Sequence, residues 1–272
     1  MASVTAADIK KLREATGAGM TDCKNALVEA DGDFDKAVEQ LRIKGLKGVA
    51  KREGRAASNG LVTAVLDGKS AGTLLELNCE TDFVAKGEKF QALAAQVVEA
   101  ARGSNDVSSI TVDGTSLKEV LDDAGATLGE KIEVRRVVTF AGAYVGLYLH
   151  RTNPDLPPQL GVLVELSGEA GDTAKDLAQH IAAFSPTYVS REEVSEEVVA
   201  KERSIAEATA REEGKPEAAL PKIVEGRVNG FFKEAVLVEQ AFAKDPKKTV
   251  AKVLSEAGVE VKGFARFKVG QA

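Results

Sequence analysis

The chain has 272 residues, of which 44% are apolar and 29% are charged, and its formal net charge is −6 at pH 7. A chain of this length buries a proper core and divides into two or more domains. The acidic balance argues against nucleic acid as the main partner, because a phosphate backbone attracts clustered Lys and Arg. An aromatic fraction of 5% without Trp also argues against platforms for stacking bases.

The N-terminal sequence lacks the basic start and apolar core of a signal peptide, and no apolar run reaches membrane-spanning length. The two cysteines, Cys23 and Cys79, lie far apart and match no metal-binding spacing. We therefore expect two small buried side chains rather than a disulfide. Together these features predict a soluble cytoplasmic protein without membrane contact.

Residues 1–55 predict a bundle of three short helices followed by a linker. Thr5 and Asp8 have the spacing of a capping box, with Asp8 in the place of the usual Glu, and Gly17 and Gly19 break the chain after the first helix. The apolar residues at helical spacing are Ile9, Leu12 and Ala15, then Cys23, Ala26, Leu27 and Ala30, then Phe34, Ala37, Val38 and Leu41. A bundle this small is near the lower limit for independent folding, so we expect a module tethered to a larger body.

Residues 44–59 are rich in Gly and basic side chains. They form either a solvated connector helix or an arm that binds phosphate. The lack of aromatic residues among the charges favours the connector.

An internal repeat predicts the organisation of the rest of the chain. Gly72–Asn78 (GTLLELN) matches Gly161–Ser167 (GVLVELS). A strand-like run precedes each copy at residues 60–66 and 143–149, and an apolar helix follows each at residues 93–98 and 177–181. The pattern predicts an α+β fold with two related core subdomains, residues 56–142 and 143–272, each with a small antiparallel sheet. The alternative is a chance similarity of two strands.

Further elements complete each subdomain. A helix with Leu117, Val120, Leu121 and Ala124 on one face and a strand at residues 132–140 complete the first. In the second, Asp245 and Pro246 are expected to begin a helix that carries Val250 and ends at Gly258. Alternation from residue 259 to 269 then predicts a half-buried strand.

Residues 190–239 predict an inserted antiparallel helical hairpin. Val194, Val198, Ile205 and Ala208 give a thin apolar seam among many Glu and Lys, residues 214–216 form a turn, and Ile223, Val228 and Phe232 give the returning seam. A thin seam with charged flanks suits two helices projecting from the body. The hairpin either mediates dimerisation or is simply solvated.

Catalytic arrangements are scarce. The only histidines are His150, at the end of an expected strand, and His180, within an apolar helical stripe. No Ser/His/Asp order, carboxylate pair or His cluster is present, and the glycines of residues 125–129 lack the Lys-Ser/Thr of a phosphate loop. We expect a protein that binds another protein, without a cofactor, a metal or catalytic chemistry of its own.

An unusual segment follows the first copy of the repeat. Thr81–Val84, here called the TDFV segment, places Phe83 and Val84 where a strand ends and a turn is expected, although turns favour Gly, Pro, Asn, Asp and Ser. Phe83 either folds back as a plug over its own sheet or, with Val84, stays exposed and enters a pocket of a partner.

Short motifs occur in order along the chain. They are Thr16–Met20 with Asp22-Cys23-Lys24, Asn78-Cys79 with Thr81–Val84, Gly129-Glu130 before Arg135-Arg136, and Val224–Arg227. Their order and spacing together resemble the bacterial translation elongation factor Ts family. The resemblance implies a ubiquitin-associated-like N-terminal domain, a two-part core and a coiled-coil excursion. It also implies a nucleotide exchange factor for the GTPase elongation factor Tu.

The resemblance implies a set of partner-binding residues. Thr81, Asp82, Phe83 and Val84 would enter the GTPase near its Mg²⁺ site, displacing Mg²⁺ and releasing GDP, and further contacts would come from Leu128, Gly129, His150 and Met20. The residues themselves leave alternatives. Gly129 also suits a plain helix C-cap, His150 a surface position, and Met20 a hydrophobic staple.

Other expectations concern the assembly. The hairpin would support a homodimer or a 2:2 complex. Longer members of the family continue into a C-terminal helical module, and the contacts of that module are not carried over to this chain. Two other hypotheses are an adaptor that recruits an unrelated protein through its N-terminal bundle and an enzyme that uses His150 with nearby carboxylates.

Overall fold

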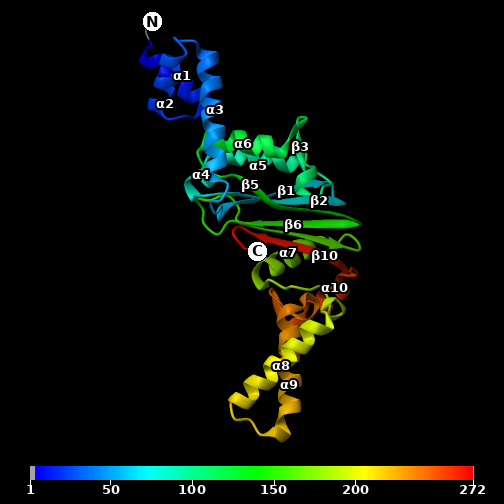
Figure 1. Ribbon diagram of the computed structural model, residues 1–272. Helices are drawn as coiled ribbons and strands as arrows, with labels where there is room; N and C mark the ends of the chain where they lie inside the picture. The colour runs from blue at the N-terminus through cyan, green and yellow to red at the C-terminus, as the bar shows by residue number, and fades with distance from the viewer. Residues whose placement is uncertain (1–3, 272) are drawn as a thin grey trace.

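Two three-stranded antiparallel sheets lie face to face at the centre of the molecule (Figure 1). The computed structural model describes residues 4–271. The first sheet has the order β1-β2-β5 and the second the order β10-β7-β6. The strands are β1 (Asn59–Asp67), β2 (Ala71–Cys79), β5 (Glu133–Ala141), β6 (Tyr144–His150), β7 (Leu160–Leu166) and β10 (Val261–Lys268). The α+β class with small antiparallel sheets is therefore confirmed.

Helices cover the outer face of each sheet. On the first sheet, α5 (Glu88–Ala100) and α6 (Leu117–Leu128) follow the short α4 (Asp82–Lys86). On the second sheet lie α7 (Asp172–Phe184) and α10 (Val250–Ala257). The strands that carry the repeat, β2 and β7, are the central strand of their sheets, which explains why both read as almost continuous apolar runs.

The two sheets approach closely because each copy of the repeat begins with a glycine. A Cβ atom at Gly161 would lie 2.6 Å from Cγ1 of Val62 and 2.8 Å from Cδ1 of Leu74. One at Gly72 would lie 3.2 Å from Cδ2 of Leu163 and 3.2 Å from Cγ1 of Val145, both in the other sheet. Val62, Leu74, Val145, Leu163 and Phe267 form the apolar layer between the sheets. A larger residue at either glycine would force this layer apart.

An ion pair with a buried carboxylate joins the last strand to the first sheet. The Glu76 side chain is fully buried, and its Oε2 lies 2.7 Å from Nε of Arg136. Arg136 also donates to the carbonyl of Lys268 at 3.2 Å, and its guanidinium lies 4.4 Å from the ring centroid of Phe267. The amide of Gly270 donates to Oε1 of Glu76 at 3.1 Å. Both partners are thus hydrogen-bonded on more than one side, which offsets the desolvation of the buried carboxylate.

The N-terminal helices are α1 (Ala6–Thr16), α2 (Met20–Glu29) and α3 (Phe34–Arg52). The expected capping box forms, because Asp8 accepts from the Thr5 amide at 3.0 Å and donates its own amide to Oγ1 of Thr5 at 3.2 Å. The buried core of these helices contains Leu12, Cys23, Ala26, Leu27, Ala30, Ala37 and Leu41. The basic residues after position 44 continue α3, so the connector is helical as far as Arg52.

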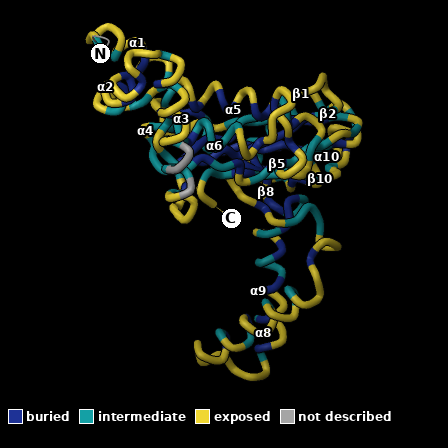
Figure 2. The backbone as a smooth tube through the Cα atoms, turned by 45° about the horizontal axis from the view of Figure 1, so that its top comes forward, coloured by how far each residue is buried: buried dark blue, intermediate teal, exposed yellow. Residues whose placement is uncertain are grey.

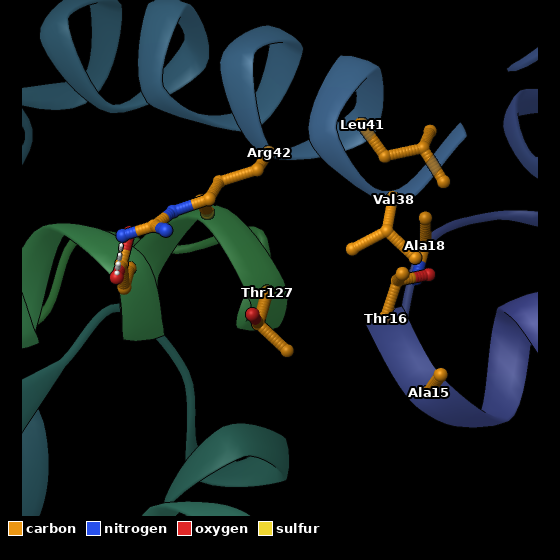
Figure 3. Close-up of a pocket in the computed structure, with 9 residues that line it drawn as sticks. Ala15, Thr16, Ala18, Val38, Leu41, Arg42 and Thr127 are labelled. Atoms are coloured by element: carbon orange, nitrogen blue, oxygen red, sulfur yellow. Dashed lines mark hydrogen bonds and ion pairs between the residues drawn. The ribbon is translucent and has the colours of Figure 1, made fainter. Parts of the chain in front are cut away.

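The joint between α3 and α6 holds the N-terminal helices on the core (Figure 3). Arg42 forms a two-pronged ion pair with Asp123, with N–O distances of 3.1 and 2.6 Å. Gly45 faces Ala126 so closely that an added Cβ atom would lie 2.6 Å from the Cβ of Ala126. A cleft of about 220 Å³ remains, lined by the end of α1, the middle of α3 and the end of α6.

A pair of helices projects from the second sheet, away from the N-terminal helices (Figure 1). They are α8 (Glu196–Glu212) and α9 (Leu220–Ala235). The buried residues between them and at their base are Val194, Ala206, Ala210, Leu220, Val224, Val228, Phe232 and Val236, and Figure 2 shows how little else is buried there.

The expected seam of α8 is wrong in its second half. Ile205 is 49% exposed, Ala208 is exposed, and Ala206 and Ala210 are buried instead. The buried side chains of α9 are large, so only small residues of α8 fit against them. Helical spacing alone is compatible with either stripe, the predicted one with Ile205 and Ala208 or the observed one with Ala206 and Ala210.

The expected start of the last helix is also wrong. Residues Asp245–Thr249 form β9, which pairs with β8 (Ala241–Phe242), and α10 begins only at Val250. Thr249 is the N-cap, and its hydroxyl accepts from the Lys252 amide at 3.3 Å. Pro246 fits a two-stranded ribbon because an edge strand leaves some amides without a ladder partner. Gly258 ends α10 as expected, with φ +69°.

Two smaller expectations can be compared with the structure. Cys23 and Cys79 are both buried free thiols, as predicted. No helix within residues 4–271 combines the length and apolar character that a membrane crossing needs.

Candidate functional site

The TDFV segment forms the start of α4 rather than a turn at a strand tip. Thr81 is the N-cap, and its hydroxyl accepts from the Val84 amide at 3.4 Å. Phe83 is 81% exposed, so the interpretation of Phe83 as a plug over its own sheet is wrong. Ala85 is fully buried and anchors the helix on the core.

The prediction that Val84 is exposed is wrong, because of its position in the same helix. Val84 is half-buried and packs against the core of the first sheet. Successive side chains of a helix point about 100° apart, so neighbouring residues in α4 face different environments. Phe83 faces solvent, whereas Val84 and Ala85 face the core.

Asp82 is paired within α4. Its carboxylate lies 3.0 Å from the Lys86 ammonium, an exposed i,i+4 pair of the kind that stabilises a helix only slightly. The same ammonium lies 5.9 Å from the ring centroid of Phe83. The acidic and the aromatic side chain of the segment therefore project from one short helix and share one lysine.

Glu130 binds the backbone two and three residues before Phe83. Its Oε2 accepts from the amides of Glu80 and Thr81, both at 3.0 Å, and its Oε1 accepts from the Thr81 hydroxyl at 2.5 Å. In return, the Glu80 carboxylate accepts from the Lys131 amide at 2.7 Å and from Nη1 of Arg55 at 3.1 Å. These two groups, the Lys131 amide first, lower the pKa of the Glu80 carboxyl. Residues 80–81 and 130–131 are thus cross-linked in both directions.

Sequence reasoning missed the roles of Glu80 and Glu130. A signal for Glu130 was available, since a carboxylate just after the C-terminal end of a helix is unfavourable to the helix dipole and needs a compensating partner. Glu130 follows the C-cap of α6 at Gly129. Nothing in the local sequence, however, indicates that its partners lie about fifty residues earlier.

Cys79 supports the same segment from below. Its thiol donates to the carbonyl of Thr81, with an Sγ–O distance of 3.1 Å. Burial raises the pKa of the Cys79 thiol to about 12. The thiol therefore keeps its proton at neutral pH and remains a hydrogen-bond donor.

Leu128 and Gly129 lie at the end of α6, next to the TDFV segment. Leu128 is half-buried and packs against the core of the first sheet. Gly129 has φ +79° and donates its amide to the carbonyl of Gly125 at 2.9 Å, which makes it a left-handed C-cap. Among residues 4–271, no heavy atom beyond the neighbouring residues lies within 4 Å of the position of an added Cβ, so the positive φ accounts for the glycine.

His150 is exposed at the end of β6, and its Nδ1 lies 2.9 Å from the hydroxyl of Tyr148. The start of β6 adjoins the turn between β1 and β2, since the Val145 amide donates to the carbonyl of Lys69. From this turn β2 runs to the TDFV segment and β6 runs to His150. Both therefore reach the same end of the stacked sheets.

Met20 begins α2 in the N-terminal bundle and is 51% exposed. It stands apart from the core residues of the predicted set. The loop just before it nevertheless adjoins α6, because a Cβ atom at Gly17 would lie 3.0 Å from Cγ2 of Thr127. The structure thus brings Thr81–Val84 and Leu128-Gly129 together, places His150 at the same end of the core, and leaves Met20 on the docked bundle.

His180 is a fully buried histidine with a fixed tautomer. Its Nδ1 accepts from the Ala243 amide at 3.1 Å, so Nε2 carries the proton and donates to Oε1 of Gln240 at 2.8 Å. The ring stacks against Phe184 and Phe242, with centroid distances of 4.7 and 5.7 Å. Burial lowers the pKa of His180. The residue has a structural role in the second subdomain.

We expect the free energy of unfolding to fall as the pH drops below the ordinary histidine pKa of 6.5. There the unfolded chain binds a proton at His180 that the native state excludes, so folding loses up to about 1.4 kcal/mol per pH unit until the native pKa is reached. Urea unfolding at pH 7.5, 6.5 and 5.5 measures the slope. The His180→Gln variant should be less stable at pH 7.5 but show a flatter pH profile. Parallel profiles of the two proteins would contradict this assignment.

Within residues 4–271, no cluster of three or more His, Cys, Asp or Glu side chains is arranged to hold a metal ion. The candidate site is an exposed surface. It consists of an exposed aromatic ring on a firmly held short helix, flanked by a helix end and a strand end.

A family model described as "Elongation factor TS" matches residues 80–271. The elongation factor Ts of Acidothermus cellulolyticus is 62% identical over 276 residues, covering 100% of both chains. That of Streptomyces griseus is 61% identical over 277 residues, covering 99% of this chain and 100% of the other. That of Thermobifida fusca is 58% identical over 278 residues, covering 100% of both. The similarity extends over the N-terminal helices, both sheets and the projecting pair of helices.

Proposed function

Because this chain belongs to the elongation factor Ts family, we propose that it binds the GTPase elongation factor Tu and promotes GDP release by displacing Mg²⁺ and distorting the phosphate site. Membership of the family gives the chain the role of a nucleotide exchange factor in translation, which is not that of a catalytic enzyme. The observation that carries the proposed mechanism is the 81% exposure of Phe83 on a short helix that Val84 and Ala85 hold against the core.

The mechanism needs no contact with the nucleotide itself. A guanine nucleotide is held largely through its phosphates and the Mg²⁺ that bridges them. A factor that binds the nucleotide-free conformation more tightly than the loaded one weakens nucleotide binding by the same ratio. A ten-thousandfold effect requires about 5.5 kcal/mol of differential binding.

Phe83 supplies a large share of this differential binding. Transfer of an exposed aromatic ring into an apolar pocket contributes about 1.5–3 kcal/mol. A pocket between helices of the GTPase that opens only without Mg²⁺ would receive the ring only in the Mg²⁺-free state. The binding free energy of the ring would then favour that state in full. Thr81 orients the helix as its N-cap, and the inward face of Val84 fixes the direction in which Phe83 projects.

Asp82 acts on the polar surroundings of the Mg²⁺ rather than as a lasting ligand of the ion. In the free protein its charge is partly offset by Lys86 at 3.0 Å. The pair is exposed and therefore weak. Asp82 is free to exchange this partner for polar groups around the metal at little cost.

The remaining predicted residues extend the contact around Phe83. Leu128 and Gly129 adjoin the TDFV segment and would touch the same domain of the GTPase, where the absence of a side chain at Gly129 permits close backbone approach. His150, at the same end of the core, would lie against the phosphate-loop side of the partner. Met20 would anchor a partner helix on the N-terminal bundle, since Met adapts to irregular apolar surfaces.

We expect the full chain to accelerate the release of fluorescent GDP from elongation factor Tu. Stopped-flow traces with excess unlabelled GDP, with and without the chain, measure the release rate. Excess Mg²⁺ should reduce the acceleration, because the ion and the chain compete through linkage. Binding without any acceleration would instead favour an adaptor role.

The assembly follows from the same proposal. Residues 1–55 would act as the accessory partner-binding module and residues 56–142 and 143–272 as the two halves of the core. The exposed Ile205 on α8 offers an apolar contact for a homodimer or a 2:2 complex. Sedimentation of the free chain and of its mixture with nucleotide-free elongation factor Tu distinguishes these states from a monomer and a 1:1 complex.

A further inference from the structure

We propose that Glu130 is a positioning residue for nucleotide exchange. Its carboxylate holds the TDFV segment, so that Phe83 projects from the free protein in the orientation that the partner receives. The role in exchange rests on the function proposed above, whereas the holding of the segment is a property of this chain alone.

The hydrogen bonds of Glu130 reach the chain where it leaves β2 and enters α4. They fix the amides of Glu80 and Thr81 and the hydroxyl that caps α4, all within three residues of Phe83. Bonds from ionised carboxylates to such donors are stronger than bonds between neutral groups. These hydrogen bonds of Glu130 end on residues 80 and 81, so its influence on the Phe83 ring passes through the backbone.

Helix α4 needs such support because it has only five residues. An isolated helix of one turn is not stable in water, since the cost of nucleation is not recovered. Thr81 supplies the N-terminal cap, Ala85 packs beneath, and Glu130 fixes the entry of the chain. Without Glu130 the exposed ring would explore several orientations, and binding would have to order the segment first.

The position of Glu130 is itself well defined. It directly follows the left-handed C-cap Gly129, and its neighbour Lys131 donates its amide back to Glu80 at 2.7 Å. The carboxylate is therefore delivered by the rigid end of α6 rather than by a free loop. This reciprocity distinguishes Glu130 from an ordinary surface glutamate such as Glu119, whose carboxylate caps the other end of α6.

The first experiment measures GDP release from elongation factor Tu with Glu130→Ala, Glu130→Gln and the control Glu119→Gln. We expect Glu130→Ala to slow release about tenfold relative to the unsubstituted chain, because ordering of the segment is added to the cost of binding. Glu130→Gln retains one acceptor oxygen and should give an intermediate rate. Glu119→Gln removes the same charge and weakens a cap of the same helix, and it should leave the rate unchanged.

A double-mutant cycle tests whether Glu130 acts through Phe83. In the Phe83→Ala background the ring is gone, so adding Glu130→Ala should slow release by less than about twofold. Full additivity of the two losses would overturn the proposal. So would equal rates for the unsubstituted chain and Glu130→Ala while Phe83→Ala is slow.

A second experiment needs no partner. The chain contains no Trp, so Phe83→Trp introduces a single fluorophore into the segment. Its steady-state anisotropy should be high and should fall when Glu130→Ala is added, with Glu119→Gln as the unchanged control. Thermal melts verify that each variant is folded. If Glu130→Ala does not fold, Glu130→Gln replaces it in both the GDP-release and the anisotropy measurements. An unsubstituted chain without exchange activity would overturn the proposed function, whereas an unchanged anisotropy overturns the positioning by Glu130.

Discussion

The Phe83→Ala variant is expected to release GDP from elongation factor Tu about ten- to hundredfold more slowly than the unsubstituted chain, following from the loss of about 1.5–3 kcal/mol of burial in the partner. Its melting temperature should stay nearly unchanged, because substitutions of exposed side chains alter stability by less than about 0.5 kcal/mol. Phe83 is 81% exposed, and the Lys86 ammonium lies 5.9 Å from its ring centroid. Stopped-flow release and calorimetry on the same preparation measure the two quantities.

Leu66→Ala is a suitable control for this variant. Leu66 is also a partly exposed apolar residue, but it lies near the opposite end of β1, beside the β1–β2 turn. Its side chain reaches toward Gly72, so its loss should lower the melting temperature slightly and leave GDP release unaffected. The two variants thus have opposite expected profiles. A Phe83→Ala protein that melts early and still releases GDP rapidly would contradict the proposed role of the ring.

The Arg136→Met variant is expected to lose about 3–5 kcal/mol of unfolding free energy, because it leaves the carboxylate of Glu76 buried without a counterion. The two groups lie 2.7 Å apart, and Glu76 has no exposed surface. The substitution also removes the bond from the guanidinium to the carbonyl of Lys268, which ties β10 to the first sheet. Urea unfolding monitored by circular dichroism measures the loss.

The double variant Glu76→Leu with Arg136→Met separates the two causes of that loss. With both charges replaced by apolar side chains, the desolvation penalty disappears, and most of the stability should return. The Gly270 amide would still lose its acceptor, so recovery should be incomplete. A double variant as unstable as the single one would mean that packing around Phe267, rather than an unpaired charge, dominates.

Much of the fold was predictable because its signals are local. The repeat at Gly72 and Gly161 marks the central strand of each sheet, and the glycines that end α1 and α10 follow from backbone geometry. Errors arose where two local patterns compete. Asp245-Pro246 and Thr249 both suit a helix start, and only the pairing of β8 with β9 selects Thr249.

The candidate site was predictable in part. The resemblance indicated which segments would carry it, but the direction of each side chain in α4 depends on the phase of a one-turn helix, which no periodicity reveals. Val84 was therefore expected to be exposed and is half-buried. Glu130 was beyond local reasoning because its partners are remote in sequence and meet it only after both elements dock on the first sheet.

Helix α3 acts as an unbroken shaft between the N-terminal bundle and the core, since its 19 residues pass from the bundle to the joint with α6. The rotation of α3 about its axis therefore determines the direction in which Met20 faces relative to the core. A single residue inserted between the bundle and Arg42 would rotate the bundle by about 100° and move it about 1.5 Å along the helix axis. An insertion of four residues would nearly restore the original orientation of the bundle, about one helical turn farther from the core. A change in the length of α3 therefore changes the distance of the bundle from the core and its orientation at the same time.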